Sequence, residues 1–441
     1  MEKTSGIRSS NLSIGVDEKI SWQQSLILGL QHVLAMDVYV PPVIIASAVA
    51  MSATNSAALI QSTFLGAGIA SLIQVLFFLR LPVCQGPSFV PIGALVGIII
   101  SDGGKLDTAM GATLIGAIAV TLLGLTGVYK YIVKHFIPSI VSGTIIMIVG
   151  LTLLPTAFTS NIYISTKALS MNQNVFLAFI TAAIMIIFSM LGVYFSKFGR
   201  IFRISSVIIA LACGSFAASL MGGLDLSSVA SAPFFSLPHI AFINYGLSFN
   251  WSAILTMLVI YMVLLAETTG TWFAVSAVIE EPLKDEQVNR GVIGEGIGCF
   301  ISSLVGATPL TGYSTNAGII SITGVASRRV FVGASIFFIA LSFLGKLSAL
   351  INAIPSAVIG GVFAVVCMVI MLSGFRVIKN EEFSERELYI IGVPLIFAIG
   401  LLFMPSSLSK DAPQLLQYLL DSPIAISAIV AIIMNKLIPA K

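Results

Sequence analysis

Charged residues are scarce in this sequence. Asp, Glu, Lys and Arg together make up 9% of the 441 residues, against roughly 25% in a typical soluble domain, whereas hydrophobic residues make up 57%. A compact body of this size needs far more charge to stay in solution, so the composition excludes a water-soluble globular protein. Most of the surface is expected to face lipid, which predicts a multi-pass protein of the plasma membrane.

Residues that build metal centres, disulfide frameworks and nucleic-acid surfaces are also few. The four cysteines form no CxxC pair and there are three histidines, so we expect neither a metal site nor a disulfide framework. A net charge of +3 is too thinly spread to bind a phosphate backbone, which excludes nucleic acid as a partner. HExxH, GxSxG and paired-Asp motifs are absent, so we expect no enzyme and no bound cofactor.

Apolar runs, separated by charges and by proline and glycine clusters, divide the chain after a polar tail. Residues 1–24 lack the apolar core of a secretory signal and are expected to remain as a cytoplasmic tail. Because a helix needs about 20 apolar residues to cross the hydrocarbon, we predict an all-α protein with fourteen membrane-spanning segments. They lie near 25–50, 56–79, 82–100, 109–129, 136–157, 174–195, 203–222, 250–278, 291–305, 308–325, 329–348, 354–373, 388–404 and 414–435. The ninth and tenth are the least distinct and could be one span plus a re-entrant piece.

The distribution of positive charge supports this count, because Lys and Arg collect in short cytoplasmic connections. With the N-terminus inside, four of the 22 basic residues lie outside: Lys105, Lys167, Lys346 and Lys410. A wrong count in the middle of the chain would mix the two sides. The pattern therefore favours fourteen segments with both termini in the cytoplasm.

Two features suggest an internal repeat. Ile137-Pro138-Ser139 opens the fifth segment and Ile354-Pro355-Ser356 opens the twelfth. These segments are seven apart, so the halves would be inverted repeats, as in many secondary transporters, although a short motif can also recur by chance in an apolar chain. Proline and glycine interrupt segments three and ten, which cannot be continuous helices. Because paired interruptions of this kind mark binding sites, we place a substrate between 84–91 and 312–318.

Ionisable side chains inside spans are costly, at about 2.5–3.5 kcal/mol each by insertion scales, and so indicate function. Four lie in the predicted segments: His32, Asp37, Glu267 and Glu295. Glu267 has no basic residue near it in sequence, so its carboxyl is expected to be able to hold a proton at neutral pH, with helix packing as the alternative. His32 could equally be a neutral core histidine, Glu295 a solvated or interhelical group, and Asp37 could face the same cavity.

Phe89 follows Ser88 in the interrupted third segment. Its ring could stack on a planar ligand, although an aromatic side chain in a membrane helix is more often a packing residue.

Several of these residues stand in motifs that resemble the nucleobase/ascorbate transporter family, also called nucleobase:cation symporters, which includes xanthine and uracil permeases. The tenth segment reads Asn316-Ala317-Gly318, four further residues, then Thr323-Gly324, and matches the family signature except at the residue before Asn316. The other matching stretches, in family order, are Gln31-His32, Gly86-Pro87-Ser88-Phe89 and Glu267-Thr268-Thr269-Gly270.

The resemblance implies two inverted seven-span repeats, with a core domain over 25–129 and 250–348 and a gate domain over 130–222 and 349–437. It also implies a homodimer in which the core slides against the gate. Glu267 would accept hydrogen bonds from ring N–H groups, Phe89 would pack on the base, and the backbone around Ser314 and Thr315 would donate to a ring carbonyl. His32, Glu295 and Asn316 would support the site or couple it to a cation.

Two positions depart from the family pattern. Thr315 stands where Gln or Glu is usual, which removes a bidentate contact to the base edge, and Thr271 replaces an Asp or His. Thr323-Gly324 resembles the xanthine and urate branch more than the uracil branch.

We therefore expect a symporter that carries a purine such as xanthine or urate, or uracil, with a co-transported proton, sodium being the alternative ion. An anion exchanger of the same architecture is disfavoured because a buried glutamate would repel an anion. A channel would need a continuous polar stripe rather than two interrupted segments.

Overall fold

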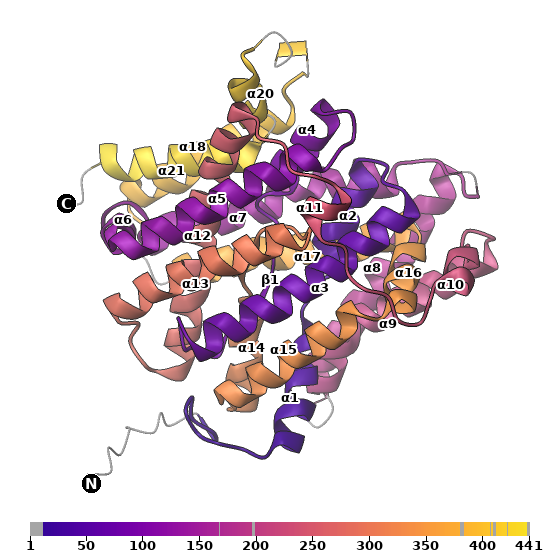
Figure 1. Ribbon diagram of the computed structural model, residues 1–441, viewed down its shortest axis with the longest axis horizontal. Helices are drawn as coiled ribbons and strands as arrows, with labels where there is room; N and C mark the ends of the chain where they lie inside the picture. Colours follow the sequence, from indigo (N-terminus) through magenta and orange to yellow (C-terminus); the bar gives the residue numbers. More distant parts are fainter. Residues whose placement is uncertain are drawn as a thin grey trace.

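The computed structural model describes residues 12–166, 168–195, 199–379, 383–405, 407–408, 412–420 and 422–438. Most of them are helical (Figure 1). Within the described residues, seven helical stretches are long and apolar enough to cross a membrane: Trp22–Ala48, Ala53–Leu76, Asp107–Thr126, Ser139–Ile162, Met171–Gly192, Trp251–Ile279 and Ser356–Ile378. The prediction of a helical multi-pass membrane protein is confirmed, and the count of fourteen stays a prediction. Lys167, Lys410 and residues 1–11 of the predicted tail lie outside the described residues.

The helices of the first half follow predicted segments one to seven in order. They are α1 (Trp22–Ala35), α2 (Val40–Ala48), α3 (Ala53–Leu76), α4 (Ile92–Ser101), α5 (Asp107–Thr126), α6 (Val128–Phe136), α7 (Ser139–Ala157) with its π-helical continuation η1 (Phe158–Ile162), α8 (Met171–Tyr194) and α9 (Gly199–Leu220).

Two short helices, α10 (Ser227–Ser231) and α11 (Ala241–Asn244), lie in the connection to the second half. The helices that follow are α12 (Trp251–Ile279), α13 (Asp285–Leu304), α14 (Thr315–Thr323), α15 (Arg328–Ser342), α16 (Gly345–Ala353), α17 (Ser356–Ile378), α18 (Glu385–Leu402), α20 (Gln414–Leu420) and α21 (Pro423–Leu437).

Several predicted segments contain more than one helix. Segment 25–50 breaks between α1 and α2, because Pro41 lies in the first turn of α2, where its missing N–H and fixed φ suit the start of a new helix. Segment 329–348 divides into α15 and α16. The first range still forms one membrane-long helical stretch, Trp22–Ala48, and the bounds predicted for the second stay a prediction.

Helices α7 and α17 begin at the two Ile-Pro-Ser sequences. Pro138 and Pro355 precede the first helical residues, as expected for a residue that lacks a backbone donor. The helices then pack closely at two glycines: a Cβ on Gly143 would lie 3.0 Å from the Gly374 carbonyl oxygen, and one on Gly374 would lie 2.5 Å from the Gly143 oxygen. Larger residues at these positions would separate the two helices.

The helices pack in two groups. Helices α7, α8, α9, α17, α18 and α21 contact one another, and α1, α3, α5, α13 and α15 form the second group. Helix α12 contacts members of both groups, namely α5 in one and α7 and α21 in the other. The assignment of these ranges to a core and a gate domain, and relative movement between the two, stay predictions.

Segments three and ten each contain a three-residue strand. Strand β1 (Gln85–Pro87) pairs with β2 (Leu310–Gly312) in antiparallel register, with Gln85 opposite Gly312 and Pro87 opposite Leu310. Two further backbone bonds extend the pair, from Ser88 N to Pro309 O and from Tyr313 N to Cys84 O. The predicted interruption of both segments is confirmed, and the two interrupted stretches meet. Helices α4 and α14 start a few residues beyond the strands.

Candidate functional site

Side chains of neighbouring helices form hydrogen bonds with the backbone groups of β1 and β2 that the strand pair leaves unpaired. Gln85 N donates to Ser71 Oγ of α3 at 2.7 Å, and Gly312 N donates to Thr268 Oγ1 of α12 at 2.9 Å. Thr271 Oγ1, one turn further along α12, donates to Gly312 O at 3.0 Å. Backbone groups at membrane depth must find partners within the protein. The hydroxyls of α3 and α12 therefore allow two short strands to exist there.

Side chains of α13 and of the residues just before α14 contact further backbone groups of the two strands. Leu310 N contacts Cys299 Sγ of α13 at 3.4 Å, and the Tyr313 hydroxyl donates to Pro87 O at 3.0 Å. Tyr313 also explains Gly86, because a Cβ on this glycine would lie 2.6 Å from the tyrosine ring. The Tyr313 ring packs on β1 at Gly86, because glycine has no side chain that would occupy this space.

Asn316 joins the two interrupted segments to α1. Its Oδ1 accepts from Cys84 N at 2.8 Å, and its Nδ2 lies 3.1 Å from His32 Nδ1. Both side chains are buried, and the His32 ring centroid is 4.4 Å from that of Phe331 in α15. Through these contacts Asn316 links α1 to the residue that precedes β1.

Glu267 lies at the other end of β1. Ser88 Oγ donates to Glu267 Oε2 at 2.7 Å, and the same hydroxyl accepts from Val90 N at 3.1 Å. The Glu267 side chain is partly exposed and forms no ion pair with any described residue. The carboxylate is thus held at the strand pair with acceptor capacity left over for a ligand.

Phe89 follows Ser88 and is buried. Its ring lies nearly parallel to that of Phe363 in α17, with an interplanar angle of 14° and a centroid separation of 6.0 Å. This ring pair joins the segment between β1 and α4 to α17.

Ser314 and Thr315 are exposed at the start of α14. Their amide groups donate to no described residue, since the first bond of this turn runs from Asn316 N to Tyr313 O. Gly318, one turn on, is also exposed, and a Cβ there would meet nothing within 4 Å. The predicted donors of α14 are therefore accessible along one edge of the helix.

The other predicted site residues lie further from this edge. Glu295 of α13 is buried and its Oε2 accepts from Gln74 Nε2 of α3 at 3.0 Å. Gln74 Nε2 also donates to Gly291 O at 2.8 Å. Thr271 is bound to the backbone of β2, as described above. Asp37 lies in the break between α1 and α2, where its backbone oxygen accepts from Val40 N at 2.9 Å.

Comparison with known proteins identifies the family. The sequence model of the xanthine/uracil permeases, described as a permease family, matches residues 23–407. The chain belongs to this family.

Relatives of similar length support the assignment. The chain is 29% identical to xanthine permease XanP of Escherichia coli, with 98% of this chain and 96% of XanP covered. It is also 29% identical to uric acid permease PucK of Bacillus subtilis, with 95% and 96% covered. Identity is again 29% to nucleobase transporter PlUacP of Paenibacillus larvae, with 93% of each chain covered.

Solved structures show the fold. The transmembrane domain of the cyanobacterial bicarbonate transporter BicA aligns with a TM-score of 0.60 at 16% identity, covering 96% of this permease and all of that domain. The structure of SLC26A9 aligns with a TM-score of 0.64 at 12% identity, covering 93% of this chain and 64% of that one. The permease therefore has a fold found in these membrane transporters.

Sequence reasoning missed three residues that shape the site: Gln74, Tyr313 and Phe363. Gln74 is a polar residue in an apolar segment and could have been found by the same cost argument that selected Glu295. Tyr313 follows Gly312 directly, but its contact with Gly86 spans more than 200 positions. Phe363 lies in an ordinary apolar helix, and nothing in the local sequence distinguishes it.

Proposed function

We propose that this permease is a secondary active transporter that carries a purine nucleobase, xanthine or urate, together with a proton. Family membership and the names of XanP and PucK support the substrate class. Sodium is the alternative coupling ion, and uracil the alternative base.

The observation that carries the proposal is Glu267 held by Ser88 at the end of β1. A purine such as xanthine presents ring N–H donors and carbonyl acceptors around a flat ring. The free acceptor capacity of Glu267 matches the N–H groups, since charge-assisted hydrogen bonds are the stronger ones. Phe89 supplies the flat apolar surface.

The start of α14 supplies the complementary donors. The amides of Ser314 and Thr315 are accessible and belong to the positive end of a helix, which suits a ring carbonyl. Thr315 in place of a longer amide or acid leaves additional space beside the base, as does Gly318. This space favours a bicyclic purine over uracil.

Proton coupling follows from the cost of a carboxylate without a cation at membrane depth. A proton on Glu267 or on Glu295 offsets this cost and links loading of the site to the proton gradient. In this scheme Gln74 holds Glu295, and His32 and Asn316 hold β1, so these residues position the site. Asp37 lies at the break beside them and is proposed to support the same site.

The transport cycle requires the larger architecture. We propose fourteen spans in two inverted repeats, cytoplasmic termini, and a homodimer in which α1–α5 and α12–α16 move as the core against α7–α9 and α17–α21. The strand pair and Glu267 then move together as one body.

Uptake into proteoliposomes tests the function. Labelled xanthine, urate, uracil, ascorbate and bicarbonate are offered with a proton gradient, a sodium gradient, or neither. We expect xanthine or urate to accumulate under a proton gradient and the accumulation to be lost when a protonophore is added. Gradient-independent exchange of bicarbonate, without accumulation of any base, would instead support an anion exchanger.

A further inference from the structure

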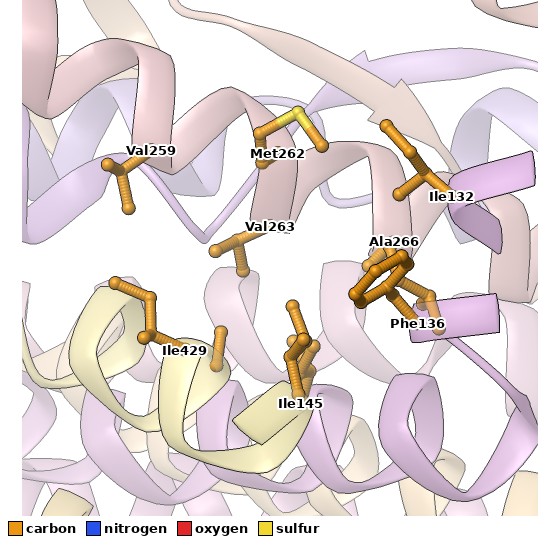
Figure 2. Close-up of a pocket in the computed structure, with 11 residues that line it drawn as sticks. Ile132, Phe136, Ile145, Val259, Met262, Val263, Ala266 and Ile429 are labelled. Carbon is orange, nitrogen blue, oxygen red and sulfur yellow. The ribbon is translucent and has the colours of Figure 1, made fainter. Parts of the chain in front are cut away.

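A groove of about 280 Å³ lies on the opposite side of α12 from the strand pair. Figure 2 shows side chains arranged around an open centre, and every stick is carbon except for the sulfur of Met262. Helix α12 contributes Val259, Met262, Val263 and Ala266, which lie on one face over two turns. No side chain that lines the groove can form a conventional hydrogen bond, so water and polar solutes gain nothing from entering it.

The opposite wall comes from the other helix group. Ile145 of α7 and Ile429 of α21 face α12 across the groove, and Ile132 and Phe136 of α6 close one end (Figure 2). Ile429 is 38% exposed, so the groove opens at the surface of α21. A molecule in the groove would contact α12 and the α7 group at the same time.

The end closed by α6 carries positive charge. Lys436, in the last turn of α21, places Nζ 4.4 Å from the centroid of the Phe136 ring. Lys436 forms no ion pair with a described residue, and Glu387, which lies near the end of α21, is paired with Arg386. Lys130 and His135 are exposed on α6 beside Tyr131, the pattern of a helix that lies at a membrane interface. An anionic group is therefore favoured at this end.

We propose that the groove holds an acyl chain of an anionic phospholipid whose phosphate lies at Lys436. The apolar wall accepts the chain, the ammonium of Lys436 accepts the head group, and the opening at Ile429 joins the site to the bilayer. This inference goes beyond nucleobase transport and does not depend on it. Lipid in the groove would bridge the two helix groups at the seam across which they are proposed to move.

Native mass spectrometry of the purified full-length permease tests the site. Phosphatidylglycerol and phosphatidylcholine with identical acyl chains are titrated against the native protein, Lys436→Gln, Ile429→Trp and Lys105→Gln. The native protein is expected to prefer phosphatidylglycerol. Lys436→Gln should weaken its binding about fivefold, the effect of one basic residue near an anionic surface, and leave phosphatidylcholine unchanged. Ile429→Trp fills the opening and should weaken both lipids, whereas the exposed control Lys105→Gln should change neither.

Each of three titration results would overturn the proposal: equal affinity of the native protein for the two lipids, equal effects of Lys436→Gln and Lys105→Gln, or unchanged binding in Ile429→Trp. Ala428→Leu adds bulk from the same helix and provides a second filling variant if Ile429→Trp does not yield folded protein. Cross-linking of Ile429→Cys between two copies in liposomes would show that protein covers the groove, and would also overturn the lipid site.

Discussion

At the scale of single residues, the carboxyl of Glu267 combines three properties that are rarely found together in a membrane. It is partly exposed, it forms no ion pair with a described residue, and it is oriented by a hydroxyl from a different segment, Ser88. A glutamate that served packing alone would be expected to have its acceptor positions filled by the protein. The open acceptor capacity favours ligand recognition.

Replacement of Glu267 by Gln should keep the protein in the membrane and abolish gradient-driven accumulation. Loss of a charge-assisted hydrogen bond of about 1.5–3 kcal/mol corresponds to about a tenfold to hundredfold weaker apparent affinity for the base. Initial uptake rates over a range of xanthine concentrations measure this effect. Glu286→Gln, at an exposed carboxyl, is the matched control, and undiminished accumulation in Glu267→Gln would remove the proposed mechanism.

Gly86 is the residue at which the site tolerates the least added volume. An alanine methyl there would overlap the Tyr313 ring at 2.6 Å, so Gly86→Ala should destabilise the protein by about 1–3 kcal/mol and lower the thermal unfolding midpoint in detergent. Gly97→Ala is the matched control, because a Cβ there meets nothing within 4 Å. Identical unfolding midpoints for the two variants would contradict the described packing.

At the scale of elements, the strand pair exists because side chains replace the strands that a larger sheet would provide. Ser71, Thr268, Thr271 and Cys299 come from three helices, and each bonds the backbone of β1 or β2. The helices thereby determine where the interrupted segments meet. Small hydroxyl and thiol residues at these positions bond the strand backbone, a role that a hydropathy profile does not reveal.

Thr271→Val should test this dependence. Valine keeps the shape of threonine but removes the donor to Gly312 O, which should cost about 1–3 kcal/mol for a buried polar group that loses its partner. Thr271→Ser keeps the donor and should retain most of the stability and uptake. Thermal unfolding and xanthine uptake of both variants provide the measurement. Equal behaviour of the Val and Ser variants would show that the hydroxyl has no such role.

The interruption of segments three and ten could be predicted because proline and glycine act locally, through a missing donor and a missing Cβ. Glu267 could be selected because ionisable groups are costly in lipid, and Asn316 because it stands in the family motif. The residues that these side chains contact could not be predicted from the sequence. Ser88 and Glu267 are 179 positions apart and Gln74 and Glu295 are 221 apart, and no periodicity in the sequence encodes such pairs.

At the scale of the whole molecule, α12 is the helix on which both groups converge. Its faces contact the strand pair on one side and α7 and α21 on another. One contact between α12 and the α7 group lies where Gly270 faces Ser142 of α7.

A disulfide across this contact should stop transport. A Cβ on Gly270 would lie 3.9 Å from the Ser142 Cβ, within the usual range of about 3.5–4.5 Å for bridged cysteines. In a Cys213→Ser background, Ser142→Cys with Gly270→Cys should lose uptake on oxidation and regain it with a reductant. The two single substitutions are the controls. Full uptake by the oxidised double variant, with the bridge verified by mass spectrometry, would exclude sliding at this contact.

The completed edges of β1 and β2 have a further consequence. An exposed strand can recruit an extended peptide or a second chain by adding to its ladder. Here side chains already occupy the outward-facing backbone groups, so this ribbon is closed to strand addition. A ligand that binds at the ends of the strand pair must therefore be recognised by side chains and helix termini. A short linear peptide could not bind there by adding a strand.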